Sequence, residues 1–258
     1  MPAPDVVAAN ADRAAASPLR VAIVGAESTG KSQLAQALAQ RLGDEFGLRC
    51  ACVGEYLRDW CDERGRTPRA DEQLGIAQEQ QRRIEQAAAQ SGVDVVLCDT
   101  TPIMISVYSE LLFDDVSLDA VARPFQQGLD ATLLTALDLP WIADGLQRDG
   151  PHVRGPVDAL VRARLNAWRI DWSLVSGTGA QRADHAIDAL RPLLRRRATP
   201  GADGETPATD STSGTTSVGS RLFSRLLDSR GGPPAPAWVC ERCDEPACEH
   251  LARRPAAP

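Results

Sequence analysis

The segment VGAESTGKSQ, residues 24–33, constrains the fold of this chain more than any other stretch. From Gly25 to Ser32 it matches G-x-x-x-x-G-K-[ST], the pattern of a phosphate-binding P-loop. The run RVAIV before it predicts a strand and SQLAQALAQRL after it predicts a helix, so a fortuitous glycine-rich turn is the weaker alternative. Successive backbone amides of such a loop form an anion nest at the helix start. The residues expected to bind a nucleotide here are Gly25, Ala26, Glu27, Ser28, Thr29, Gly30, Lys31, Ser32 and Gln33.

Lys31 is the only lysine of the chain, and every other cationic side chain except histidine is an arginine. A compact ammonium on a thin stem reaches between the β- and γ-phosphates of ATP, where a planar guanidinium does not fit. The Ser32 hydroxyl is expected to bind Mg²⁺. Asp99, which ends the apolar run VDVVLCD, is expected to hold the same ion, usually through water. The alternative for Asp99 is a cap on the helix that begins near Pro102.

Short apolar runs alternate with helical patterns from residue 20 to about residue 197. Near-continuous apolar strands separated by helices predict an α/β fold, a doubly wound parallel sheet covered on both faces. We expect a P-loop kinase domain over 19–197, after a disordered extension over 1–18. A Gly/Ser/Thr/Pro-rich linker over 198–236 carries the short amphipathic segment RLFSRLLDSR, and a Cys/His tail occupies 237–258.

The formal net charge of −7 disfavours a nucleic-acid-binding surface as the main role of the 258-residue chain. No apolar run approaches the roughly 18 residues that a transmembrane helix needs, and the first residues make a poor signal peptide. We therefore expect a cytoplasmic protein without a membrane or nucleic-acid partner.

Two features favour a small-molecule kinase among P-loop proteins. A GTPase normally reads guanine with Asn-Lys-x-Asp, and no lysine follows Lys31. Many ATPases carry a glutamate directly after the Walker-B aspartate, where this chain has Thr100. A site without that glutamate is better suited to transferring phosphate to an alcohol than to water.

A kinase also needs an acceptor site and cations for the migrating phosphoryl group. Glu55 follows the second strand pattern, with Tyr56 and Arg58 after it, and its carboxylate is a candidate to bind or deprotonate an acceptor hydroxyl. The alternative is a glutamate favoured by the helix dipole. A glycine-rich loop later in the chain predicts a lid whose arginines close over phosphates, against the alternative of an ordinary solvated loop. Its candidate residues are Arg148, His152 and Arg154.

The segments VGAESTGKS, GEYLRDW, CDTTP, LPWIADGLQRD and VSGTGAQRADHAI together resemble the ribosylnicotinamide kinase domain of the NadR-type family, a P-loop domain of the AAA-like kind. The resemblance covers about residues 19–196 and implies ATP-dependent phosphorylation of the ribose 5′-hydroxyl of nicotinamide riboside, in NAD salvage. It also implies a lid formed by Trp141, Asp144, Gly145 and Arg148, with Trp141 and Asp144 near the substrate. Residues 177–182 would form the adenine-side loop, with Arg182 flanking the base.

The chain departs from that family in one respect. Bifunctional members carry a His-x-Gly-His adenylyltransferase signature, and the three histidines of this chain are too far apart for it. The chain is therefore expected to be a stand-alone kinase, or a relative whose acceptor has drifted.

The last segment holds Cys240, Cys243, Cys248 and His250, four donors that suit tetrahedral Zn²⁺. The alternative is a disordered tail with free thiols. If the tail is the working part, the protein is an ATP-dependent regulatory or scaffold protein rather than a kinase.

The remaining cysteines and the tryptophans before the linker are expected to be structural. We expect Cys50, Cys52 and Cys98 in the core, Cys61 on a helix face, and Trp60, Trp141, Trp168 and Trp172 in the core or a pocket wall.

Overall fold

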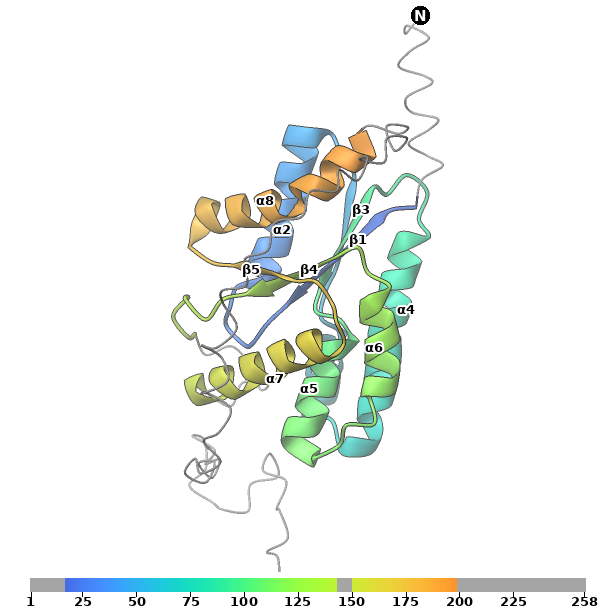
Figure 1. Cartoon of the computed structure of the whole chain (residues 1–258). Coiled ribbons are helices and arrows are strands. Elements are labelled where there is room, and N and C mark those ends of the chain that lie inside the picture. The colour runs from blue at the N-terminus through green and yellow to red at the C-terminus, as the bar shows by residue number, and fades with distance from the viewer. Residues whose placement is uncertain (1–16, 143–149, 199–258) are drawn as a thin grey trace, which may run out of the picture.

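The computed structural model describes residues 17–142 and 150–198. Its centre is a five-stranded parallel sheet in the order β2-β3-β1-β4-β5 (Figure 1). The strands are β1 (Leu19–Val24), β2 (Cys50–Val53), β3 (Val95–Asp99), β4 (Ala131–Thr135) and β5 (Ser173–Val175). The predicted doubly wound α/β fold is confirmed.

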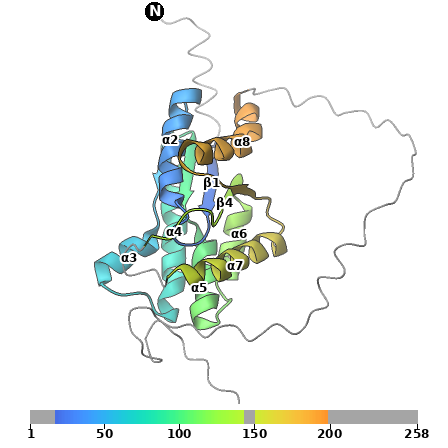
Figure 2. The same cartoon turned by 90° about the vertical axis from the view of Figure 1, so that its left-hand side faces the viewer.

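Helices connect the strands and cover both faces of the sheet. They are α2 (Lys31–Phe46), α3 (Tyr56–Arg64), α4 (Gln73–Ala88), α5 (Pro102–Phe113), α6 (Asp119–Gln127), α7 (Arg154–Ala167) and α8 (Gly179–Ala198), with short 3₁₀ turns η1 (Ala70–Glu72) and η2 (Pro151–Val153). Figures 1 and 2 show α2 and α8 on one face and α4, α5, α6 and α7 on the other.

The central strand explains why both faces are covered. Because side chains alternate along a strand, Val21 and Ile23 of β1 pack with leucines of α2 and α8, whereas Ala22 and Val24 pack with residues of α5 and α7. All four of these β1 side chains are buried. The sequence therefore reads as a continuous apolar run, as expected for a strand inside a parallel sheet.

One helix was not predicted. Residues Asp119–Gln127 form α6, which contains Pro124 and buries Ala122, Phe125 and Gln126. A proline is an unfavourable residue inside a helix, because it has no amide hydrogen to donate. In α6 it is the sixth of nine residues, so the missing hydrogen bond is the one to the Ala120 carbonyl, in the turn before the proline.

One expectation about the cysteines is wrong. Cys52 is exposed, because β2 lies at the edge of the sheet. Cys61 lies on a face of α3, as expected, and that face is buried against α4 and α5. Cys98 is in the core, as expected, and Cys50 is half-buried. Trp60 and Trp168 are also buried, as the sequence predicted.

The structure describes the expected domain over 19–197 except for residues 143–149, and the terminal segments lie outside the described residues. The extension over 1–16, the linker, the RLFSRLLDSR segment and the four Cys/His residues of the tail all lie outside the described residues. Among the helices that the structure describes, none has the length and apolar character to cross a bilayer.

Candidate active site

The predicted P-loop connects the end of β1 at Val24 to the start of α2 at Lys31. Three of its residues have positive φ, namely Gly25 at 145°, Ser28 at 52° and Gly30 at 73°. Both motif glycines therefore occupy backbone conformations that a side chain disfavours, as the sequence predicted. Gly30 is the N-cap of α2, and its carbonyl accepts the first helical hydrogen bond from Leu34.

Gly25 is also required by a close contact with β4. A Cβ atom at Gly25 would lie 2.2 Å from the Oγ1 atom of Thr135. The hydroxyls of Thr135 and Thr29 lie 2.7 Å apart, and together they reach the carbonyls of Val24 and Ala26 at 3.1 and 2.7 Å. These buried contacts hold the loop against the end of β4.

The Lys31 ammonium donates a hydrogen bond of 2.9 Å to the carbonyl of Ala26, five residues earlier. The side chain therefore folds back across the loop, which is where phosphates would lie in a P-loop. Ser32 and Gln33 are exposed at the start of α2, so the Ser32 hydroxyl is accessible to a metal ion.

Two predicted carboxylates lie at the same edge of the sheet. Asp99 ends β3 directly beside β1, is 6% exposed, and has an Oδ1 atom without a hydrogen-bond partner in the described residues. Glu55 follows β2, with 18% of its side chain exposed and 3.6 Å between its Oε2 and Nη2 of Arg58. Burial raises the pKa of Glu55, the Lys31 charge opposes this shift, and the charges of Asp99 and Glu27 reinforce it. Lys31 and three carboxylates therefore lie in one electrostatic cluster.

Glu27 is anchored by a residue that the sequence did not suggest. Its Oε1 atom accepts a hydrogen bond of 2.5 Å from the hydroxyl of Tyr108 in α5. Its Oε2 atom is buried and has no partner in the described part of the chain. Glu27 and Asp99 thus each present an unpaired oxygen, as groups prepared for a ligand do.

Gln80 of α4, a second unexpected residue, fixes the backbone around Glu55. Its side chain is fully buried, donates to the carbonyl of Gly54 at 3.1 Å and accepts from the amide of Tyr56 at 2.7 Å. The peptide units on both sides of Glu55 are therefore held by one amide. The ring of Tyr56 is covered by the Arg83 guanidinium at 4.2 Å, and Arg58 is half-buried.

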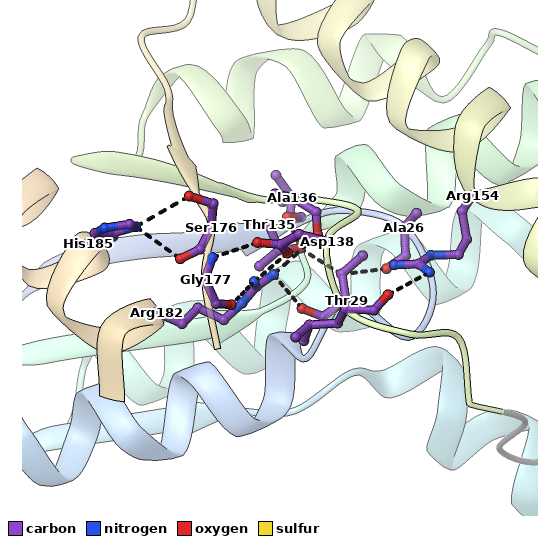
Figure 3. Close-up of polar contacts among 12 residues, drawn as sticks. Ala26, Thr29, Thr135, Ala136, Asp138, Arg154, Ser176, Gly177, Arg182 and His185 are labelled. Carbon is purple, nitrogen blue, oxygen red and sulfur yellow. Dashed lines mark hydrogen bonds and ion pairs between the residues drawn. The ribbon is translucent and has the colours of Figure 1, made fainter. Parts of the chain in front are cut away.

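The segment after β4 crosses the other side of the P-loop. The Ser28 hydroxyl donates to the carbonyl of Ile142 at 2.7 Å and lies 3.3 Å from the amide of the same residue. The first residue of α7, Arg154, donates from Nη1 to the Leu139 carbonyl at 2.9 Å. Its Nε and Nη2 atoms are buried without a partner in the described residues, and Figure 3 shows the side chain beside the P-loop. A guanidinium with two unused donors can bind an anion there.

The other lid residues are divided between the described and undescribed parts of the chain. Trp141 is half-buried, with its indole Nε1 buried and unpaired among the described residues, and His152 is exposed. Asp144, Gly145 and Arg148 lie outside the described residues.

Arg182 of α8 occupies a place that the sequence did not predict. It is 4% exposed, and its guanidinium contacts Asp138, Gly177, Thr29 and Ala136 (Figure 3). Burial alone would raise the pKa of Asp138, but hydrogen bonds from Arg182 and the Gly177 amide lower it below its ordinary value. Asp138 therefore stays ionised beside the arginine at neutral pH.

Residues 17–142 and 150–198 contain no group of three or more His, Cys, Asp or Glu side chains that could hold a metal ion without other ligands. Mg²⁺ does not need such a group, because it binds one or two protein oxygens together with phosphates and water. The exposed Ser32 hydroxyl and the unpaired Asp99 oxygen fit that requirement.

The fold has solved relatives. A NadR protein in complex with NAD and AMP-PNP superposes with a TM-score of 0.57 at 19% identity, over 69% of this chain and 50% of that chain. A NadR protein in complex with NR gives the same TM-score and identity, over 68% and 50% of the two chains. This chain thus spans about half the length of these NadR chains, and no curated protein matches its sequence.

A family model described as an AAA domain matches residues 20–182, which is well over half of the chain. The matched range begins with β1 and ends at Arg182, so it contains the P-loop and both carboxylate-bearing strand ends. The chain belongs to this AAA domain family of P-loop proteins.

Proposed function

We propose that this protein is an ATP-dependent kinase that phosphorylates a nucleoside-like alcohol, with nicotinamide riboside as its acceptor, in NAD salvage. The observation that carries the proposal is the position of Glu55. Its largely buried carboxylate, with a raised pKa, lies in the same cluster as the P-loop lysine and Asp99. A base beside the phosphate site is what an alcohol acceptor requires.

Lys31, Asp99 and Glu55 of the cluster each have a part in that reaction, as do neighbouring residues. The P-loop amides and Lys31 bind the β- and γ-phosphates. Ser32 and Asp99 would hold Mg²⁺, which would neutralise charge on the phosphates. The Glu55 carboxylate takes the proton of the acceptor hydroxyl as the hydroxyl oxygen bonds to the γ-phosphorus. The bond from that phosphorus to the bridging oxygen breaks, and ADP leaves. The two unused donors of Arg154 stabilise the charge on the phosphoryl group in transit.

The charges around Lys31 favour an acceptor without a phosphate group. Three carboxylates, Glu27, Glu55 and Asp99, lie in one cluster with two cations, Lys31 and Arg58, and the excess negative charge would repel an anionic acceptor. The pyridinium ring of nicotinamide riboside carries a positive charge and its ribose offers hydroxyls. Both properties suit a cluster of this charge.

The fold supports the same assignment at a coarser level. The NadR structures that share it were solved with NR in one case, and with NAD and AMP-PNP in the other. At 19% identity this likeness concerns the fold, so the acceptor has to be established by experiment.

The test is acceptor-dependent ADP formation by the purified full chain with Mg²⁺ and ATP. The acceptor panel should contain nicotinamide riboside, the common nucleosides and their 5′-monophosphates, and mass spectrometry should identify the product. We expect turnover with nicotinamide riboside, a product heavier by one phosphoryl group, and no turnover with the monophosphates. Lys31→Ala is the control for a contaminating kinase. The proposal fails if no alcohol raises ADP formation above the basal rate.

A further inference from the structure

Arg182 connects three separate segments around the phosphate site. Its Nη2 atom donates to the Thr29 carbonyl of the P-loop at 2.8 Å and lies 3.2 Å from the Ala136 carbonyl after β4. Its Nη1 atom donates to Asp138 at 2.7 Å and to the Gly177 carbonyl of the β5–α8 loop at 2.8 Å. Only Nε, which is also buried, has no partner in the described residues.

The bond to Thr29 determines how one P-loop amide points. The peptide unit between Thr29 and Gly30 is planar and trans, so its carbonyl and its N–H point in opposite directions. Because Arg182 holds the carbonyl on the side of α8 and β4, the Gly30 N–H is held toward the opposite side. A phosphate nest depends on several amides that keep such a common direction.

Asp138 keeps Arg182 in this position. One carboxylate oxygen accepts from Arg182 and the other accepts from the backbone amide of Gly177 at 2.5 Å. A guanidinium with only 5% of its side chain exposed needs such a partner, since an unpaired buried charge is costly. The carboxylate also ties the β5–α8 loop to the same guanidinium, as Figure 3 shows.

We propose that Arg182 is a positioning residue of the phosphate site: with Asp138, it orients the P-loop backbone and links it to the β5–α8 loop, instead of contacting the base. This differs from the role implied by the NadR resemblance, in which Arg182 flanks adenine. The inference rests on the nucleotide-binding part of the proposed function and is independent of the acceptor.

The two roles predict different ligand dependence. Inorganic tripolyphosphate carries the phosphates of ATP without a base, so a positioning residue affects both ligands whereas a base contact affects ATP alone. We would measure the dissociation constants of MgATP and Mg-tripolyphosphate by calorimetry for the wild type, Arg182→Met and Asp138→Asn. Loss of one charge-assisted hydrogen bond corresponds to roughly a tenfold change in affinity. We expect Arg182→Met to weaken the binding of both ligands by about that factor. Asp138→Asn should also weaken the binding of both ligands to the same extent, but by a smaller factor than Arg182→Met.

Arg164→Met is the matched control for a general loss of stability. Arg164 is similarly buried at 6% and pairs with Glu110 and Asp119, but its contacts join α5, α6 and α7 rather than the P-loop. We expect this variant to lower the melting temperature and leave both dissociation constants unchanged below it.

The inference is overturned if Arg182→Met weakens ATP but not tripolyphosphate, if it changes neither, or if Arg164→Met weakens both equally. It is also overturned if the wild type binds no tripolyphosphate. By contrast, a protein that binds both ligands but phosphorylates no alcohol would contradict the kinase proposal and leave this inference standing.

Discussion

Gly25→Ala tests whether the P-loop depends on its contact with β4. The new Cβ would lie 2.2 Å from Oγ1 and 3.2 Å from the backbone oxygen of Thr135, at a φ of +145° that side chains rarely adopt. The backbone strain costs about 1–3 kcal/mol. Displacing the Thr135 hydroxyl breaks its contacts with Thr29 and Val24, at about 0.5–1.5 kcal/mol each. We therefore expect the free energy of unfolding to fall by about 2–6 kcal/mol.

Urea denaturation followed by circular dichroism measures this loss, and two further variants test its origin. In Gly30→Ala the added Cβ would overlap with the terminal Cδ1 of Leu139 at 2.9 Å and lie in ordinary contact with Oε1 of Gln33 at 3.6 Å, at a φ of +73°, so the cost should be about 1–2 kcal/mol. Adding Thr135→Ala to Gly25→Ala removes the atom that overlaps. The double variant should then lose less stability than the sum of the two single variants. Additive losses, or a Gly25 variant no less stable than the Gly30 variant, would refute this account.

Three further predictions concern the cluster around Lys31. Lys31→Ala should abolish measurable nucleotide binding and leave the melting temperature nearly unchanged, because within the described residues the ammonium makes a single hydrogen bond, to the Ala26 carbonyl; global unfolding would contradict this. For Glu55, a pKa raised by burial means that the ionised form is disfavoured in the folded state, so wild-type stability relative to Glu55→Gln should decline as the pH rises from below 4.5 to neutrality. Melting temperatures of the wild type and Glu55→Gln across this pH range check the direction of the change. Acceptor-dependent kcat/KM should increase as the pH rises in the wild type but not in Glu55→Gln. Gln80→Leu should lower kcat with little effect on ATP affinity. Gln73→Leu, at a buried glutamine two turns earlier in α4 whose Oε1 has no partner in the described residues, should leave both kcat and ATP affinity unchanged.

The elements that could be predicted are those whose signals are local in the sequence. The P-loop is one continuous segment between a strand pattern and a helix pattern, so Gly25, Gly30 and Lys31 were placed correctly relative to β1 and α2. Asp99 could be placed because it ends an apolar run. In contrast, α6 was missed, because Pro124 hides a helix whose buried face is formed by only a few residues.

The supporting residues could not be predicted, because their contacts join segments far apart in the chain. Arg182 is 153 residues from Thr29, and Tyr108 is 81 residues from Glu27. Nothing in the local sequence distinguishes Gln80 from the other glutamines of α4. Asp138 did carry a weak signal, since it follows a buried strand, and polar residues at that edge of a parallel sheet are candidates for a site.

The order of the strands explains why the predicted residues meet although the sequence scatters them. β1 leads into α2 on one face of the sheet, and its neighbour β3 leads into α5 on the other face. Because these adjacent strands are followed by helices on opposite faces, their carboxyl ends mark the position where ligands usually bind in such sheets. The P-loop follows β1 and Asp99 ends β3, so they lie next to this point. Glu55 follows β2 and Asp138 follows β4, the strands on either side of that pair. A sequence that identifies strand ends but not strand order can therefore nominate residues that lie together at this edge, while the buried contacts that orient them require the three-dimensional structure.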